Sequence, residues 1–487
     1  MAYQNTLAMR LFILYFIFGI LSVSLSFPIN IFWWLAISCV AILIVKKQFW
    51  IYFILILGFL GGFCWTQKIY ARYSFRPDLA LKEITVKGEI IRDPVISNSF
   101  QYLAVRSLDF KKYTSEDVFI TQLPFYLSPE IGDIVLIKGT IDKATYNPFD
   151  IFLKNKITYS VNLLKCEFLK KKEGFNVFLV FSRLRNFIIT KINNVFPPNE
   201  ASLASMLLLG KNFKGYNQEI SQTFNKAGIS HLIVISGFHL TLIADILNYV
   251  FQFLFLSSFG LSFLNIVFMG CFVILVGFSA SLIRAVIMSL LSIISRYFHR
   301  IYNATNSLLL SAFVILIINP SVLISDLGFQ LSFLSVASLI FITPFISSCL
   351  SWIPQKRFLG WLKNALATSL AIFVGLMPFL IYKTGNVTLT MPLANLILVP
   401  LISILLFLLF INVLLLIFIY PLGKIFSFFS YLYLNLILQL ASLFAKSKFS
   451  QYPLPLISIF WVLIYYIILI YALSQFYKKH RETTLYF

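Results

Sequence analysis

A segment of twelve residues, ISHLIVISGFHL at 229–240, holds two of the four histidines of a strongly apolar chain. His231 and His239 flank Ser236 and Gly237. A serine that hydrogen-bonds a histidine can act as a nucleophile, and histidines at suitable spacing can hold a metal ion. Polar groups in apolar surroundings can also line a water-filled path, or join neighbouring helices through hydrogen bonds.

The motif itself gives little support to catalysis. A GxSG-like serine motif needs glycine where Val234 stands, and neither histidine has a partner at i+4. The chain contains no HxxEH or HxHxD string. On a continuous helix His231 and His239 lie about 80° apart, which predicts one broad polar face shared with Ser236. We therefore expect no catalytic residue, metal or cofactor, whereas a polar lining and interhelical hydrogen bonding both stay open.

Four further polar residues interrupt the apolar stretches that follow: Arg284, Asp326, Gln330 and Asn395. Arg284 lies near the start of its stretch, where it can extend toward the membrane surface or offer a fixed cation to phosphate. We expect Asp326 or Ser325 to cap a helix, with Gln330 facing neighbouring segments. Asn395 lies between Pro392 and Pro400, which predicts a broken helix that either lines a pathway or packs against protein.

The composition indicates the elements that must position these residues. Hydrophobic residues make up 59% and charged residues 12% of the 487 residues. Apolar runs of about 18–25 residues recur, and a helix of about 20 residues crosses the hydrocarbon core. We predict a polytopic α-helical membrane protein with about 10–13 spans, the first of which is an anchor and not a removed signal peptide. The candidate spans are 7–27, 29–45, 49–66, 231–256, 261–278, 281–298, 306–319, 327–349, 363–382, 386–420 (a pair broken at Pro400), 424–445 and 454–476.

Basic residues predict the orientation of the chain, because lysine and arginine favour cytoplasmic loops. Arg10, Lys46 and Lys47 place the N-terminus and the second connection in the cytoplasm, and Lys478 and Lys479 do the same for the last residues. The polar region 67–174 is then extracytoplasmic. It holds 13 of the 18 acidic and 17 of the 39 basic residues, so the remainder of the chain is strongly basic. The excess of basic residues outside this region either sets the orientation of the chain in the membrane or attracts a polyanion or anionic lipid.

The polar region is rich in residues that favour strands. Its five candidate strands are EITVKGEII, FQYLAVRSLDF, DVFITQLPFYL, IGDIVLIKGTI and ITYSVNLLKCEF. Short strands separated by turn signals predict a small β-barrel, and an OB-like barrel fits the size. Gly139 permits a bend in the fourth strand. Aromatic residues could stack on bases, although most are expected in the barrel core: Phe100, Tyr102, Phe119, Phe125, Tyr126 and Tyr146.

Three helices are expected between this region and the histidine motif. Residues 176–196 form a basic helix that could lie at the membrane surface, and two shorter helices follow. Gly210 and Gly228 stand where these short helices should end. The five cysteines show no CxxC spacing, which favours buried thiols over a metal site or a disulfide framework.

Several strings together resemble the ComEC family of competence proteins. They are MLLLGKNFK, FNKAGISHL with the motif that follows it, SLIRA, NPSVLISDLGFQLSF and PLANLILVPL, in that family's order. Upstream, IGDIVLIKGTIDKATYNPFDIFLKNKIT is similar to the end of the family's extracytoplasmic OB-like region. The resemblance covers most of residues 50–400.

The resemblance implies an inner-membrane channel that passes single-stranded DNA into the cytoplasm during natural transformation. By motif matching it implies channel positions at Ser236, Gly237, His239, Arg284, Asp326, Gln330 and Asn395, beside His231. Implied regions are 1–66 as N-terminal transmembrane helices, 67–174 as the OB-like domain, 175–228 as interfacial helices, 229–477 as the channel domain and 478–487 as a basic cytoplasmic tail. The implied partners are single-stranded DNA, membrane lipids, a DNA receptor, a separate nuclease, and a cytoplasmic motor or single-strand-binding protein.

The sequence departs from the family pattern mildly at Val234 and Phe238, where small or aliphatic residues are expected, and more strongly in a second respect. Many members carry a C-terminal metallo-β-lactamase-like domain with an HxHxDH string, which is absent here. No Walker A string is present either, so we expect the driving force from another protein. Two alternatives stay open: an intramembrane hydrolase or nuclease that uses Ser236 and His239, and a small-solute or lipid transporter on the same scaffold.

Overall fold

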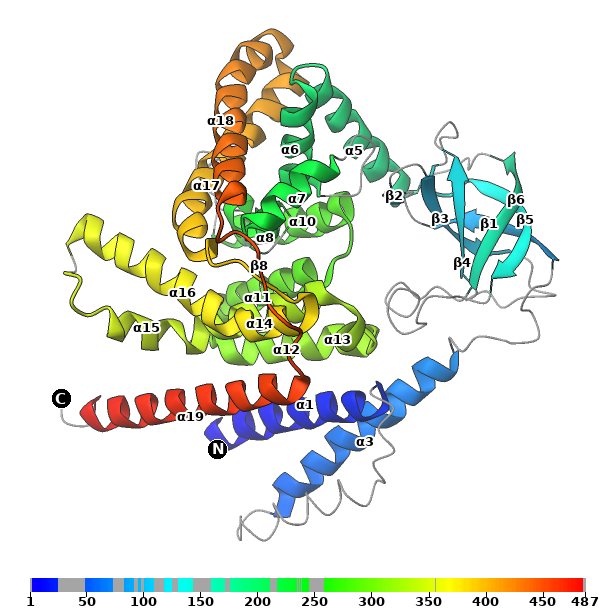
Figure 1. Ribbon diagram of the computed structural model, residues 1–487. Helices are drawn as coiled ribbons and strands as arrows, with labels where there is room; N and C mark the ends of the chain where they lie inside the picture. Colours follow the sequence, from blue (N-terminus) through cyan, green and yellow to red (C-terminus); the bar gives the residue numbers. More distant parts are fainter. Residues whose placement is uncertain are drawn as a thin grey trace. The chain divides into compact units, whose positions relative to one another are not determined.

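The computed structural model describes most of the chain (Figure 1). The described residues are 2–24, 49–72, 83–91, 95–97, 100–108, 118–124, 130–142, 159–170, 176–210, 217–244 without 234, 236 and 238, 258–354 and 356–484. They divide into two compact units, which we treat separately. The first contains the described residues of 1–184 and 277–330, and the second those of 185–276 and 331–487.

The described residues are mostly helical, as predicted for a polytopic membrane protein. Six helices are long and apolar enough to cross a membrane, and a bent pair brings the number to seven. Three shorter apolar helices cover Met9–Val23, Ile54–Ile69 and Ala304–Ile318. The predicted span 29–45 and the second half of 231–256 lie outside the described residues, so the predicted total of 10–13 is not tested.

In the first unit, α1 (Ala2–Ser24) and α3 (Phe49–Arg72) pack through glycines. A Cβ added at Gly62 would overlap the Phe16 carbonyl, and one at Gly58 would lie 2.6 Å from the Phe12 carbonyl oxygen. Glycines spaced four apart let membrane helices approach closely. Arg10 Nε also donates to Asn306 Oδ1 at 2.6 Å, which joins α1 to α12. The other helices of this unit are α11 (Ala280–Tyr297), α12 (Ala304–Ile318) and α13 (Val322–Ser325).

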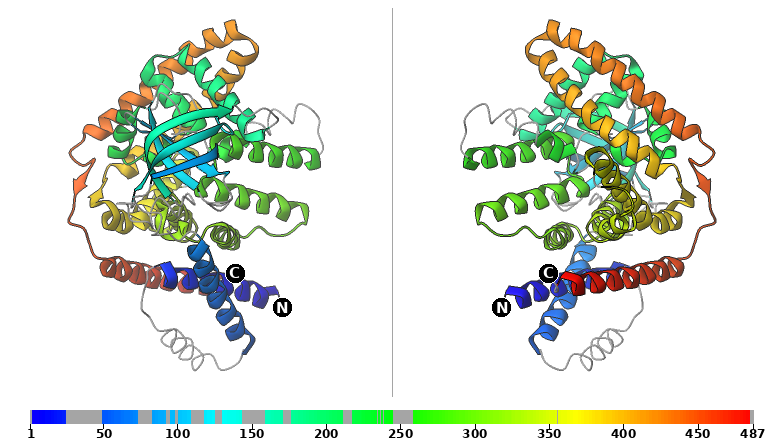
Figure 2. Two further views of the ribbon diagram at one scale, coloured as in Figure 1. Left: turned by 90° about the vertical axis from the view of Figure 1, so that its right-hand side faces the viewer. Right: turned by 90° about the vertical axis from the view of Figure 1, so that its left-hand side faces the viewer.

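All five predicted strand segments form strands, and a short sixth joins them. The strands are β1 (Glu83–Ile90), β2 (Val95–Ser97), β3 (Phe100–Ser107), β4 (Val118–Pro124), β5 (Ile134–Asp142) and β6 (Tyr159–Lys170). Their order is β1-β5-β6-β4-β3-β2, and a further pairing of β1 with β3 links the two sides of the sheet. The strands curve around a common core in Figure 2. The β5–β6 register shifts between Lys138 and Gly139, at the glycine predicted to permit a bend.

The core of this sheet is aliphatic in the part that the structure describes. Alternate residues of β1 point inward, which is the period of a strand with one buried face. The buried cluster consists of Ile84, Val86, Ile90, Leu103, Val105, Val135, Ile137 and Val161. Tyr102 is only half-buried and stands outside the cluster. The expectation that aromatic residues fill the core is therefore wrong for Tyr102, because β-branched and leucine side chains occupy the inward positions.

The helices that connect this sheet to the membrane part agree with the sequence. They are α5 (Val177–Asn193), α6 (Pro198–Leu209) and α7 (Gln218–Lys226). Gly210 and Gly228 follow α6 and α7 with φ of 88° and 78°. Residues other than glycine rarely adopt such values, so both positions act as the predicted helix stops.

The second unit holds most of the long helices. They are α10 (Ser258–Val276), α16 (Arg357–Thr384), α17 (Met391–Phe418), α18 (Tyr420–Lys446) and α19 (Ile459–Thr484). The shorter elements are α8 (Ser230–Ile233), α15 (Thr343–Cys349) and a ribbon of β7 (Asn386–Val387) with β8 (Tyr452–Pro453). α14 (Leu327–Phe341) begins at the boundary of the units and meets α15 at a bend of 46°.

One predicted break is wrong. α17 continues from Met391 to Phe418 with Pro400 inside it, whereas the sequence predicted two segments separated at that proline. A proline removes one backbone donor, but an interruption would leave several unpaired backbone groups in a medium without water. An unbroken helix therefore loses fewer hydrogen bonds than a broken one.

Candidate functional site

Two of the resembling motifs contact each other inside the second unit, and one of them also contacts residues just before the string PLANLILVPL. A Cβ at Gly210, after α6, would lie 3.6 Å from Ile235 Cδ1, which is ordinary contact. A Cβ at Gly228 would lie 2.8 Å from Thr388 Cγ2 and 2.9 Å from Met391 Cβ, closer than side chains tolerate. The histidine motif thus lies between the end of α6 and the start of α17. We call this contact region the glycine junction; it comprises Gly210, Gly228, Ile235, Thr388 and Met391.

The histidine motif is not one continuous helix. α8 ends at Ile233, Ile235 is not helical, and Gly237 and residues 239–244 are helical again. Ser236 lies outside the described residues. The angle of about 80° assumed an unbroken helix, so that geometric argument fails. The two imidazoles nevertheless lie close enough to interact electrostatically.

The two histidines have different surroundings. His231 is exposed on α8, whereas the side chain of His239 is only 1% exposed. His239 forms a hydrogen bond with the backbone of Leu232, which connects the two sides of the interruption. Gly237 is half-buried between them. The buried His239 thus bonds across the interruption to the residue next to His231.

Asn395 lies one turn inside α17, close to the glycine junction in sequence. Its side chain is 6% exposed, and Thr390, just before the helix, is 9% exposed. Asn395 Oδ1 and Thr390 Oγ1 have no hydrogen-bond partner among the described residues. A buried polar atom without a partner costs about 1–3 kcal/mol. The start of α17 therefore offers two buried oxygen atoms to a polar group.

In the first unit, Asp326 and Gln330 have local structural roles. Asp326 Oδ1 accepts from the Gly328 N–H at 2.8 Å, so it caps α14 as one sequence interpretation predicted. Gln330 Nε2 donates to the carbonyls of Leu323 at 2.8 Å and Ile324 at 2.9 Å. These bonds tie the four-residue α13 to the helix that follows it.

Arg284 is buried in the second turn of α11, with 7% of its side chain exposed. Ser279 caps this helix by accepting from the Leu282 N–H at 3.3 Å. A side chain that extends to the membrane surface would keep its guanidinium exposed. The burial of Arg284 therefore disagrees with that alternative and leaves a cation inside the first unit.

The eight candidate residues thus fall into two sets. The first unit contains Arg284, Asp326 and Gln330, and the second contains His231, Gly237, His239 and Asn395, with Ser236 outside the described residues. Sequence reasoning identified the glycines as helix stops but missed that they contact the other motifs. The sequence analysis did not select Thr390, because a threonine just before a helix is common and does not by itself indicate a functional site.

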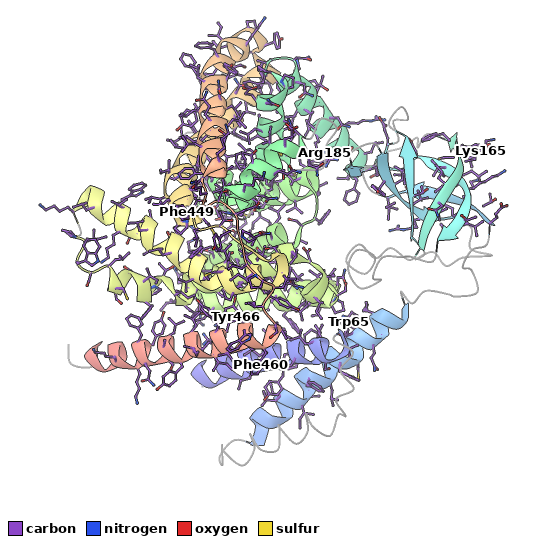
Figure 3. All side chains as sticks on the ribbon, viewed as in Figure 1. Trp65, Lys165, Arg185, Phe449, Phe460 and Tyr466 are labelled. Atoms are coloured by element: carbon purple, nitrogen blue, oxygen red, sulfur yellow. The ribbon has the colours of Figure 1, made fainter. Side chains whose placement is uncertain are left out.

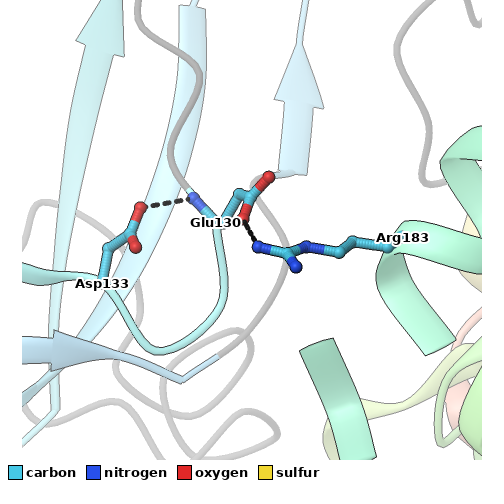
Figure 4. Close-up of polar contacts among 3 residues, drawn as sticks. All are labelled: Glu130, Asp133 and Arg183. Atoms are coloured by element: carbon cyan, nitrogen blue, oxygen red, sulfur yellow. Dashed lines mark hydrogen bonds and ion pairs between the residues drawn. The ribbon is translucent and has the colours of Figure 1, made fainter. Parts of the chain in front are cut away.

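The three basic residues of α5 differ in their contacts. Arg183 forms an ion pair with Glu130 at 2.9 Å, in the turn that Asp133 stabilises by accepting from the Glu130 N–H (Figure 4). Arg185 is buried, and burial lowers the pKa of its guanidinium. Lys191 Nζ lies 5.3 Å from the Phe187 ring and 5.1 Å from the Tyr420 ring, at cation–π distance. The three cations of this helix therefore have three different environments, and its position at the membrane surface stays a prediction.

Within the described ranges, no three or more histidine, cysteine or acidic side chains are grouped so that they could hold a metal ion. The site is instead built from glycine contacts, a buried imidazole and buried amide and hydroxyl oxygens. Such groups can pack helices closely or contact a polar chain through neutral hydrogen bonds.

Comparison with known proteins agrees with the motifs. A family model described as Competence protein matches residues 207–479, more than half of the chain and all eight candidate residues. ComE operon protein 3 of Bacillus subtilis (strain 168) is 29% identical over 217 residues, which is 45% of this chain. The alignment covers only 26% of that relative's length. No solved structure matches the chain. The sequence motifs and the family match lead to one conclusion: the chain belongs to the competence protein family.

Proposed function

We propose that this chain forms a channel in the cytoplasmic membrane that passes single-stranded DNA into the cell during natural transformation. The family match over residues 207–479 carries the proposal, because competence is the capacity to take up DNA. The six or seven candidate spans support a multi-pass membrane protein. Because a channel performs no bond chemistry, we propose no catalytic residue.

We further propose that the sheet of the first unit is an OB-like domain that meets DNA outside the membrane. β1, β3 and β4 pair antiparallel in succession, β4 pairs parallel with β6, and β6 returns through β5 to β1. This ring of five strands supports the proposal, because OB folds are small five-stranded barrels. Lys87, Arg106 and Lys138 are exposed on it. Exposed cations of this kind attract the phosphate backbone of a single strand.

The membrane part would conduct the strand through weak contacts. Conduction requires groups that bind a passing ligand and release it again. The neutral oxygens of Thr390 and Asn395 and the imidazole of His239 are suited to such exchange. The glycine junction would fix their positions, because the side chains of Ile235, Thr388 and Met391 lie close to the backbone of its two glycines. A DNA receptor, a nuclease and a motor would be supplied by other proteins.

The proposal is tested in a deletion strain that expresses variants of the chain. We measure DNA binding at the surface, DNase-resistant uptake and chromosomal integration separately. Loss of the chain should abolish uptake while surface binding persists. His239→Ala and Arg284→Ala should lower uptake with normal amounts of inserted protein, whereas the exposed Tyr471→Phe should not. Normal uptake in the deletion strain would refute the function, and normal uptake in both alanine variants would remove these residues from the channel.

A further inference from the structure

α16 contains a proline that leaves a backbone carbonyl without its usual partner. Pro378 has no N–H, so the carbonyl four residues earlier, at Val374, cannot accept the normal helical hydrogen bond. Tyr465 of α19 donates its hydroxyl to this carbonyl at 3.0 Å. The next residue, Tyr466, donates to the Gly375 carbonyl at 2.8 Å (Figure 3). Tyr465 therefore satisfies the carbonyl that Pro378 leaves free, and Tyr466 adds a bond to the next carbonyl, whose own helical donor is the Phe379 N–H.

The same helix supplies a hydroxyl at a second irregularity. Tyr477 donates to the carbonyl of Phe341 at 3.1 Å, and Phe341 is the last residue of α14 before the 46° bend. Carbonyls in the last turn of a helix lack intrahelical donors. In lipid, a carbonyl of this kind needs a donor from protein or from water that enters a cavity. α19 provides that donor at both irregularities.

The two irregular helices touch each other at the level of the proline. A Cβ added at Gly375 would overlap the hydroxyl of Ser338, which is 2% exposed on α14. Ile342, Ala371 and Leu473 form a buried cluster that joins the bend between α14 and α15 to α16 and α19. Phe345 and Phe476 add an edge-to-face ring contact at 5.4 Å.

α19 binds these helices along one stripe. Its inward residues recur every three or four positions: Val462, Tyr466, Leu469, Leu473 and Phe476. That spacing describes one face of a helix. Phe460, Trp461, Ile467 and Tyr471 are largely exposed elsewhere on α19. The three hydroxyl bonds are therefore the polar part of an otherwise apolar contact.

We propose that α19 is a latch on the membrane part: its tyrosine hydroxyls hold the proline region of α16 and the bend after α14 in one arrangement, and the latch releases when the pathway opens. In the latched state the freed carbonyls accept from tyrosine. In the released state they accept from water that fills the open path. The release step rests on the proposed DNA channel, whereas the latch contact does not.

The latch contact is tested without DNA. We compare Tyr465→Phe/Tyr466→Phe with Tyr471→Phe, which removes an exposed hydroxyl from the same helix. Hydrogen–deuterium exchange is measured on purified protein in lipid nanodiscs, in peptides that cover residues 374–384. We expect the double variant to exchange about tenfold faster there, because local opening no longer breaks the tyrosine bonds. Exchange equal to wild type would overturn the latch.

The release step is tested by locking the contact. Ala371→Cys/Leu473→Cys is introduced in a chain whose five native cysteines are replaced, and the disulfide fraction is measured on gels. Oxidation should lower DNase-resistant uptake about tenfold, as expected when one state of a two-state equilibrium is held, and reduction should restore it. Each single cysteine variant controls for the oxidant. Normal uptake by fully cross-linked protein would overturn release. If uptake does not depend on the chain at all, the proposed function fails, while the exchange result still decides the latch contact.

Discussion

Gly228 and Met391 are separated by more than 160 residues, yet a Cβ on the glycine would lie 2.9 Å from the Cβ of the methionine. The turn after α7 is therefore pressed against the first residue of α17. Since Gly228 also has a φ of 78°, both its backbone conformation and its surroundings require glycine. This contact joins two motifs that the sequence presents as independent.

The first prediction concerns this contact. Gly228→Ala combines backbone strain with overlap against Thr388 and Met391, so we expect a loss of about 2–4 kcal/mol in unfolding free energy. Gly277→Ala is the matched control, because Gly277 has a φ of 106° but no atom within 4 Å of an added Cβ. Thermal unfolding in detergent should show a clearly larger fall in Tm for Gly228→Ala. Equal falls would mean that strain alone matters and that the junction is not tightly packed.

The second prediction separates capping from charge at Asp326. Asp326→Ala removes the acceptor for the Gly328 N–H and should cost about 1 kcal/mol, whereas Asp326→Asn keeps an acceptor and should cost only a few tenths. Chemical denaturation of the purified protein gives these values. DNA uptake then reports the charge: if Asp326→Asn is stable but impairs uptake, the carboxylate acts on the pathway as well as on the helix.

The third prediction compares two neighbouring glycines of α3. A Cβ at Gly62 would overlap the Phe16 carbonyl, but one at Gly61 would make ordinary contact with the Phe16 ring at 3.8 Å. We expect Gly62→Ala to lower stability by about 1–3 kcal/mol through separation of α1 and α3, and Gly61→Ala to be neutral. Limited proteolysis of membranes and thermal unfolding both test this. Similar behaviour of the two variants would contradict the close packing of α1 on α3.

The fourth prediction concerns the thiol of Cys166 on β6. Burial raises its pKa above the ordinary 9.0, and the charge of Glu167 raises it further. Only the thiolate is alkylated rapidly, so at pH 8 a variant with Cys166 as its single cysteine should react slowly with iodoacetamide, and faster as pH rises past 9. Glu167→Gln lowers the pKa, so reaction at pH 8 should accelerate modestly because burial remains. A rate like that of an exposed peptide cysteine would show that β6 does not bury this thiol.

Local patterns predicted the parts of the fold that depend on local forces. The alternation in EITVKGEII is a property of eight or nine residues, and it forms β1 with inward Ile84 and Val86. β2 was missed because three residues are too few to show a period. The positions of Gly210 and Gly228 were predicted as helix ends, but their contacts with Ile235 and Met391 depend on packing between distant segments.

The predicted break at Pro400 is wrong for a physical reason. The sequence analysis divided the helix at that proline, whereas the structure continues α17 through Pro400. Propensity rules describe helices in water, where a freed backbone group finds a solvent partner. Inside a membrane protein, the hydrogen-bond partners available to the backbone decide whether a helix continues past a proline. Pro400 and Pro378 are examples, because both lie inside helices.

The last prediction separates a channel from a hydrolase at the histidine motif. A serine nucleophile would require His239 as its base, and a buried imidazole can serve equally as a polar contact for a passing strand. Purified protein should therefore give no turnover of labelled single strands, esters or peptides. Ser236→Ala should leave the background rate of turnover unchanged. In cells, His239→Ala should lower DNA uptake. His239→Gln keeps a hydrogen-bond donor for the Leu232 backbone and should retain more uptake than His239→Ala. Turnover that disappears in Ser236→Ala would establish the hydrolase instead, because a channel lining has no reason to depend on that hydroxyl for bond cleavage.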